Sequence, residues 1–224
     1  AGPVVYLNVE DSRDLIHSRI HSIGRYIESP EKRQMLDEQM HVIPAVGMNF
    51  RIAEKVEGGR IVPTGQFQEW AKRIAALKPR LVILDTLNRL ASGLDENSNG
   101  EMGQLMSLID AFNRQVGCTT LIVHHASKAA MWSGQGDAQQ AGRGASAVTD
   151  NARWQLNLMT PTKEQAQEYG LSEEDRKKWV KVEHAKVNAG PPMPHWYARR
   201  GEGGVLTGHP VPPWEINPPK KYNK

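Results

Sequence analysis

The 224-residue sequence lacks several features, and each absence excludes a class of protein. It contains a single cysteine, Cys118, so no disulfide can form within the chain, and a cytoplasmic location is the default expectation. No apolar run approaches the roughly 18 residues that span a membrane, so we expect no membrane partner. No secretory leader is visible in a sequence that begins at Ala1 rather than at methionine.

Two chemical signatures are also missing. The sequence has no HExxH motif and no cysteine pair, so the usual zinc centres have no ligand set. It also has no GxxxxGK(S/T) loop, the segment whose backbone N–H groups and lysine hold the phosphates of a nucleotide.

The composition describes a polar globular chain. The hydrophobic fraction is 39% and the charged fraction is 24%, and the length suffices for one large α/β domain or two small ones. The net charge of +3 and the isoelectric point near 9.0 are compatible with a nucleic-acid partner without requiring one. Residues 210–224 hold five prolines and three lysines, which is typical of a surface tail. We therefore predict a folded core at 1–207 and a tail at 208–224.

The order of the predicted elements favours an α/β fold with a largely parallel sheet flanked by helices and with antiparallel strands toward the C-terminus. Strands are predicted at 3–9, 81–85, 118–123, 153–159, 179–188 and 195–199, and helices at 11–27, from 29 onward, and at 65–78, 101–116, 145–152 and 162–178. Asp11 or Ser12 and then Ser29 are the expected helix caps. Residues 41–46 contain Pro44 and are predicted to form an edge strand or an irregular segment. Residues 51–63 are predicted to form a β excursion that turns at Gly58-Gly59.

Residues 81–90, LVILDTLNRL, are the most informative segment. Four apolar residues followed by Asp85 are typical of a fully buried strand of a parallel sheet, and ligands lie at the carboxyl ends of such strands. In phosphoryl-transfer ATPases an aspartate at this position holds the magnesium of the bound nucleotide. The alternative is an aspartate that caps the next loop, and the motif alone favours neither.

Three predicted core strands end in polar side chains, namely Glu10, Asp85 and the pair His124-His125. If the strands are parallel, these residues lie along one sheet edge, where one carboxylate would hold a metal while Glu10 orients and deprotonates water. The alternative for Glu10 is a charge that stabilises a helix N-terminus. Adjacent strand residues point to opposite faces, so both histidines cannot face one site. One of them either contacts a γ-phosphate or is a histidine satisfied within the core.

Residues 126–144, ASKAAMWSGQGDAQQAGRG, have no apolar period. Segments this long without regular structure are usually functional or disordered. Lys128, Trp132 and Arg143 in this segment suit a single-stranded nucleic acid, because basic groups contact phosphates and an aromatic ring stacks on bases. A lid over an active site is equally compatible with the composition.

Several segments in combination resemble the hexameric plasmid replicative helicases of the RepA type, which belong to the RecA-like ATPase superfamily. The resemblance extends from about Gly2 to Leu206, and the segments that carry it are GPVVYLNVED, LVILDTLNR, LIVHHASK, AGRGASAVTDNARW and AKVNAGPP. The resemblance implies a RecA-like fold, ATP and Mg²⁺ as cofactors, and DNA-dependent ATP hydrolysis. It also implies single-stranded DNA as a partner and a homo-oligomeric ring, with six subunits in this family. The loops after Asp85 and after His125 would face the central channel of the ring.

The resemblance implies roles for four residues within one subunit. Glu10 matches the catalytic glutamate, and Asp85 matches the aspartate that holds Mg²⁺ through water. Thr86 stands beside it in the nucleotide site, and His125 matches the sensor of the γ-phosphate.

Two further residues are implied to act on a neighbouring subunit. Arg153 matches the arginine finger, which neutralises charge on the transferred phosphoryl group; without the resemblance, an arginine at a strand edge is the simpler interpretation. Lys186 matches the lysine of the finger strand, although Asn188 stands where some relatives carry arginine.

The missing phosphate-binding loop departs from this family, whose members carry it before the strand that opens this chain. We therefore expect a fragment of a longer protein, with impaired ATP hydrolysis by itself and with an open sheet edge that another segment must cover. Two other functions fit the residues. One is a RecA-like module that binds DNA or regulates without hydrolysis, and the other is a metal-dependent nuclease or hydrolase built on Asp85 and the histidine pair, which needs more clustered carboxylates than we find.

Overall fold

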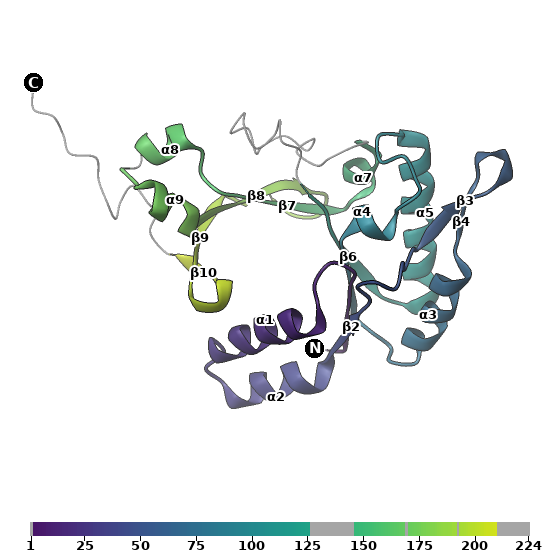
Figure 1. Cartoon of the computed structure of the whole chain (residues 1–224), viewed down its shortest axis with the longest axis horizontal. Coiled ribbons are helices and arrows are strands. Elements are labelled where there is room, and N and C mark those ends of the chain that lie inside the picture. Colours follow the sequence, from purple (N-terminus) through teal and green to yellow (C-terminus); the bar gives the residue numbers. More distant parts are fainter. Residues whose placement is uncertain (1, 126–145, 169, 192, 210–224) are drawn as a thin grey trace, which may run out of the picture. The chain divides into compact units, whose positions relative to one another are not determined.

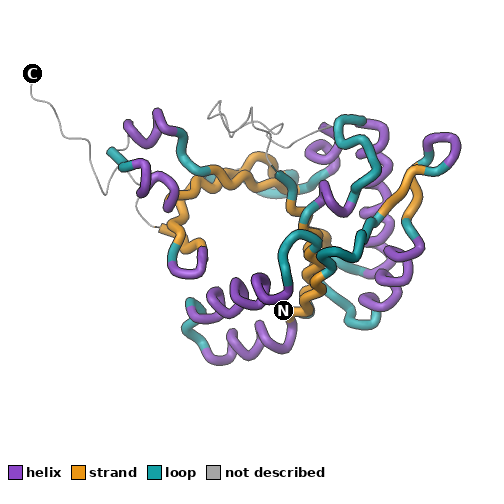
Figure 2. Tube along the Cα trace, in the orientation of Figure 1, coloured by secondary structure: helices purple, strands orange, loops and turns teal. Residues whose placement is uncertain are grey.

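The computed structural model describes residues 2–125, 146–168, 170–191 and 193–209. They belong to two compact units, the first formed by residues up to 125 together with 146–151 and the second by residues 152–209. Each unit contains a four-stranded sheet (Figures 1 and 2). Among the described residues, no helix combines the length and apolarity needed to cross a membrane. The DNA-binding candidates Lys128, Trp132 and Arg143 lie outside the described residues.

The first unit is built on a parallel sheet, as predicted. Its strands are β1 (Val4–Asn8), β2 (Met40–Pro44), β5 (Leu81–Asp85) and β6 (Thr119–Val123), in the order β2-β1-β5-β6. The register pairs Asn8 with Asp85 and Asp85 with Val123, so the carboxyl ends of β1, β5 and β6 are level. Pro44 ends the edge strand β2, where its missing N–H interrupts no ladder.

The strand β6 forms the other edge of this sheet. Among the described residues no strand pairs with its outer side, and Leu121 and Val123 are each 37% exposed. The open edge that the sequence led us to expect is therefore present, and it lies on β6.

Helices lie on both sides of the sheet, with α1 and α2 on one side and α3 and α5 on the other (Figure 1). They are α1 (Arg13–Arg25), α2 (Pro30–Gln39), α3 (Gly65–Ala75), α4 (Leu87–Leu90), α5 (Asn99–Val116) and α7 (Ser146–Asn151). The hydroxyls of Ser12 and Ser29 accept hydrogen bonds from Leu15 N and Lys32 N, which confirms both predicted caps. The one-turn helix α4 was not predicted from the sequence.

The main core of the first unit lies on one face of the sheet. Val5 and Leu7 of β1 and Val82 and Leu84 of β5 are fully buried and pack with residues of α3 and α5 in one apolar cluster. Leu81, Ile83 and Asp85, which lie on the other face of β5, are only partly buried. The prediction of a fully buried strand at 81–85 was therefore wrong, because Leu81 and Ile83 on the second face of β5 are covered only in part and Asp85 ends that face.

A short antiparallel hairpin joins β3 (Ala53–Lys55) to β4 (Ile61–Pro63). The chain turns at Gly58 and Gly59, whose φ angles of +79° and +77° favour glycine, and this confirms the predicted turn. The hairpin contributes Lys55, which reaches the first turn of α5.

The second unit is an antiparallel sheet with two short helices. Its strands are β7 (Trp154–Met159), β8 (Trp179–Val187), β9 (Trp196–Arg200) and β10 (Leu206–His209), in the order β10-β9-β8-β7. The predicted helix at 162–178 was wrong, because the structure has α8 (Lys163–Glu168) and α9 (Glu173–Lys178) instead. Gly170 has a φ of +64° between them, and the hydroxyl of Ser172 caps α9.

Candidate functional site

Residues after three parallel strands meet at one carboxylate. Thr86 Oγ1 donates a hydrogen bond of 3.0 Å to Glu10 Oε1, the same oxygen that lies 3.4 Å from Arg89 Nε and 3.6 Å from His125 Nε2. Glu10 follows β1, Thr86 follows β5 and His125 follows β6, so the level strand ends bring them together. Because its contacts lie with residues after β5 and β6, Glu10 is not simply a charge at the start of α1.

Asp85 lies beside this cluster and is held from β1. Tyr6 Oη donates a hydrogen bond of 2.5 Å to Asp85 Oδ2, and Asn8 Nδ2 donates one of 3.0 Å to the same oxygen. Asn8 Nδ2 also lies 2.8 Å from Tyr6 Oη, to which it donates. The alternative of an aspartate that caps the next loop is not favoured, since its hydrogen bonds run across the sheet.

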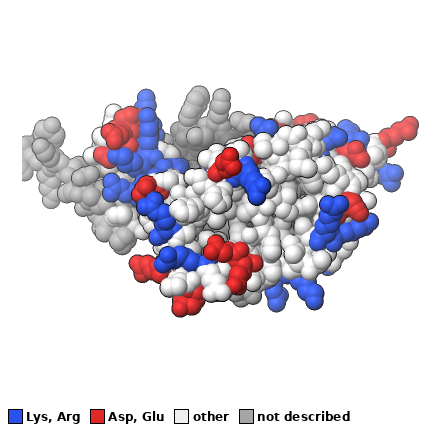
Figure 3. Space-filling view, turned by 60° about the horizontal axis from the view of Figure 1, so that its bottom comes forward, with Lys and Arg blue, Asp and Glu red and all other residues white. Residues whose placement is uncertain are grey.

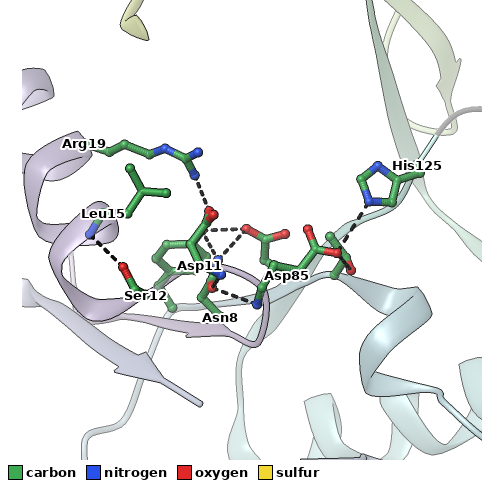
Figure 4. A network of polar contacts seen from close by, with 10 residues as sticks. Asn8, Asp11, Ser12, Leu15, Arg19, Asp85 and His125 are labelled. Carbon is green, nitrogen blue, oxygen red and sulfur yellow. Dashed lines mark hydrogen bonds and ion pairs between the residues drawn. The ribbon is translucent and has the colours of Figure 1, made fainter. Parts of the chain in front are cut away.

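Asn8 connects the two carboxylates of the site. Its side chain is completely buried, and its Oδ1 accepts hydrogen bonds from the backbone N–H groups of Glu10 (3.1 Å) and Asp11 (2.8 Å). Its amide therefore fixes the turn that carries Glu10, while its Nδ2 contacts Asp85 (Figure 4). Asp11 in turn pairs with Arg19 on α1.

Tyr6 remains a hydrogen-bond donor in this environment. Burial, followed by the hydrogen bond to Asp85, raises the pKa of the Tyr6 phenol above its ordinary value of 10.0. The phenol is therefore protonated at neutral pH, and its proton is directed at Asp85 Oδ2.

The two histidines at the end of β6 have different surroundings, as the alternation of strand residues predicts. His125 contacts Glu10, whereas His124 lines a cavity of about 340 Å³. The other residues that line this cavity are Leu87, Asn88, Ala91, Ser92, Gly93, Leu94, Asp95, Glu96, Met102 and Val148. The end of β6 thus borders both the Glu10 cluster and this cavity.

The loop that follows α4 is acidic and is hydrogen-bonded to the first turn of α5. Residues 91–100 include Asp95 and Glu96 and contain no lysine or arginine. Glu101 accepts hydrogen bonds from Asp95 N (2.9 Å) and Lys55 Nζ (2.7 Å), and the Lys55 ammonium, followed by the Asp95 N–H, lowers the pKa of the Glu101 carboxyl. This loop lacks the cations that contact nucleic-acid phosphates.

Arg153 and Lys186 belong to the second unit and lie at one end of the β7–β8 pair. The exposed Arg153 directly precedes β7, and its carbonyl accepts a hydrogen bond of 3.1 Å from Asn188 N. Lys186 lies on β8 opposite Gln155. The side chain of Arg153 makes no ion pair with any described residue.

The charges on the surface are mixed. On the face in Figure 3, acidic and basic side chains occur in small interspersed groups rather than in one continuous basic area. Within the described ranges, no group of three or more His, Cys, Asp or Glu residues is arranged to hold a metal ion. The arrangement suits a cation that brings other ligands with it, because Mg²⁺ in nucleotide sites is held by one or two carboxylates, phosphates and waters.

A comparison with protein families identifies the class of this site. The model of the AAA domain family matches residues 1–131, which is more than half of the chain and includes every residue of the Glu10–Asp85 site. The chain belongs to the AAA domain family. AAA domains are nucleotide-binding modules of the ATPase type, so a nucleotide and Mg²⁺ are the cofactors expected in general.

The residues of this AAA domain fit part of that requirement. Asp85 could hold Mg²⁺ through Oδ1, which receives no hydrogen bond from the described residues, and Glu10 could hold a water molecule. The groups that would hold the phosphates are not supplied by a GxxxxGK(S/T) motif in this sequence.

Sequence reasoning missed three residues of the site. Tyr6 and Asn8 alternate with the apolar residues of β1, and this period-2 pattern was a signal that one strand face is polar. Arg89 lies one helical turn beyond Thr86, but nothing in the local sequence indicates that it approaches Glu10.

Proposed function

We propose that this chain is the ATPase core of a subunit of a ring-forming DNA helicase of plasmid- or phage-type replication, which couples ATP hydrolysis to movement along single-stranded DNA. The observation that carries the proposal is the convergence of Thr86, Arg89 and His125 on Glu10, next to the held carboxylate of Asp85. The membership in the AAA family and the resemblance to RepA-type helicases support it.

In this proposal Glu10 positions a water molecule and accepts its proton as the general base. Thr86 and Arg89 orient the Glu10 carboxylate, since both contact its Oε1 oxygen. Asp85 holds Mg²⁺ through water, and the Mg²⁺–ATP complex supplies the phosphoryl group and neutralises its charge.

The proposed coupling to DNA uses His125 and the loops that follow Asp85 and His125. His125 contacts Glu10 and begins the segment that carries Lys128 and Trp132, so a change at the γ-phosphate would be transmitted along the chain to the DNA. Arg153 and Lys186 would act on the nucleotide of the neighbouring subunit in a hexameric ring.

The test of hydrolysis is DNA-stimulated ATPase activity of the full-length gene product and of its Glu10→Gln variant. We expect kcat to fall about 10²–10⁴-fold, the range for loss of a general base, with a smaller effect on KM. The matched control is Glu69→Gln, the same change at a carboxylate that is 57% exposed on α3. Unchanged turnover in Glu10→Gln would remove Glu10 from this role.

The test of the ring is complementation between two inactive variants. Glu10→Gln removes the proposed cis function, and Arg153→Ala removes the proposed trans function. Mixed rings should regain part of the activity, because some interfaces combine an intact Glu10 with an intact Arg153 from the neighbour. Absence of any regained activity in mixed oligomers would contradict a trans role for Arg153.

A second candidate function is a DNA-binding or regulatory module without hydrolysis. The lack of a GxxxxGK(S/T) motif favours it. It predicts that this chain binds single-stranded DNA without nucleotide, with an affinity that falls steeply as salt rises. Tryptophan fluorescence measures this binding, with Trp132→Phe as the control for the proposed stacking residue. Failure to bind DNA without nucleotide would count against the module.

A further inference from the structure

One oxygen of Asp85 is already fully used by the protein. Asp85 Oδ2 accepts a hydrogen bond of 2.5 Å from Tyr6 Oη and one of 3.0 Å from Asn8 Nδ2, whereas Oδ1 receives none from the described residues. Neither donor belongs to the predicted machinery of the site. The two oxygens of the proposed metal-binding carboxylate are therefore not equivalent.

The fold holds this arrangement from several directions. Asn8 and Asp85 are register partners on adjacent parallel strands, so their side chains leave the sheet on the same face. Asn8 is completely buried, and its Oδ1 is anchored by the N–H groups of Glu10 and Asp11, which prevents its Nδ2 from turning away. Asn8 Nδ2 also donates to Tyr6 Oη, which orients the phenol proton toward Asp85.

The hydrogen bonds to Oδ2 limit how the Asp85 carboxylate can coordinate a cation. To coordinate a metal through both oxygens, Asp85 would have to give up two donors, one of them a short hydrogen bond to a charged acceptor. Ca²⁺ takes 6–8 oxygen ligands and often binds carboxylates through both oxygens, whereas Mg²⁺ demands near-octahedral geometry, keeps its waters and uses carboxylates sparingly. A carboxylate with one available oxygen suits Mg²⁺, because that oxygen can accept a hydrogen bond from a water that Mg²⁺ keeps.

We propose that Tyr6 and Asn8 are positioning residues that set the choice of divalent cation, because they reserve Asp85 Oδ2 and leave only Oδ1 for a metal or for its bound water. This inference rests on the proposed function, since it requires a nucleotide-bound cation at Asp85. It gives a role to the partly buried hydrogen bonds among Tyr6, Asn8 and Asp85, which neither the family match nor the sequence motifs explain.

The test compares Tyr6→Phe with the wild type in the full-length gene product. This change removes only the hydroxyl, and the ring is partly buried, so the fold should be retained and is checked by thermal melting. Binding of a fluorescent non-hydrolysable ATP analogue is titrated in Mg²⁺ and separately in Ca²⁺, which needs no turnover. Hydrolysis in each cation is then measured as a second readout.

We expect the ratio of Mg²⁺- to Ca²⁺-supported affinity to fall about tenfold in Tyr6→Phe, the size typical of one charge-assisted hydrogen bond. Affinity in Ca²⁺ should rise, because Asp85 Oδ2 then has one donor to give up instead of two when it coordinates the larger ion. The matched control is Tyr26→Phe, the same change at a tyrosine that is 47% exposed at the end of α1, and it should leave the ratio unchanged.

Two results separate this inference from the proposed function. If the wild type binds the analogue in neither cation, the proposed function is overturned and the inference with it. If the wild type binds the analogue in Mg²⁺ but Tyr6→Phe has the same cation ratio, the role of Tyr6 is overturned while the proposed function stands.

Discussion

Replacing Asn8 by alanine tests whether one buried amide organises the site. The side chain makes four hydrogen bonds, to Tyr6, Asp85, Glu10 N and Asp11 N. Each contributes about 0.5–1.5 kcal/mol net, and a bond to a charged group contributes about 1.5–3 kcal/mol. Water will replace part of the lost hydrogen bonding, because Glu10 and Asp11 are only partly buried. We therefore expect the free energy of unfolding of the first unit to fall by about 3 kcal/mol.

The assay must report on the first unit alone, since a chain with two compact units need not unfold in one step. Hydrogen exchange of the β1 and β5 amides gives that free energy directly. Asn88→Ala is the matched control, because Asn88 makes one hydrogen bond to Glu96 at the surface and should cost about 0.5 kcal/mol. If Asn8→Ala destabilised these amides no more than Asn88→Ala does, the organising role of Asn8 would be refuted.

Two further predictions concern other parts of the first unit. The Lys55 ammonium, followed by the Asp95 N–H, holds the pKa of Glu101 below its ordinary 4.5, so the stability from this pair is complete above that value and is lost as pH falls through the lowered pKa. The hydrogen-exchange protection factor of the Asp95 amide should therefore fall on acidification. In Glu101→Gln the protection factor of this amide should be low at every pH. Phe112 is 4% exposed, with the rings of Phe67 and Trp70 centred 5.2 and 5.9 Å away. Phe112→Ala should lower the free energy of unfolding of the unit by about 4 kcal/mol and Phe112→Leu by about 1.5 kcal/mol, as measured by chemical denaturation. Equal losses in the two variants would contradict the importance of ring packing.

The elements that depend on local chemistry were predictable from the sequence. Ser12 and Ser29 were identified as caps because a hydroxyl before an apolar-periodic segment satisfies the first N–H groups of a helix. The 162–178 helix was mispredicted because charged helix-forming residues on both sides of Gly170 obscured the break that this glycine introduces.

Some contacts of the candidate site were likewise predictable from the sequence, and others were not. The meeting of Glu10, Thr86 and His125 follows from placing polar residues at the ends of parallel strands, which topology alone makes neighbours. The contacts of Tyr6 and Asn8 with Asp85 join residues 79 and 77 positions apart. They depend on the register between β1 and β5, and a register is fixed by the packing of both strands rather than by either sequence segment.

The open side of β6 has a consequence for anyone who purifies this chain. The N–H and C=O groups on its outer side, with which no described strand pairs, form a template for a strand from another molecule. Thr119–Val123 contains neither the lysine nor the proline with which natural edges discourage such pairing. Leu121 and Val123 add apolar surface to that template. Oligomers of the isolated chain can therefore arise by strand addition at β6, and a ring has to be demonstrated by its closed stoichiometry rather than by mass alone.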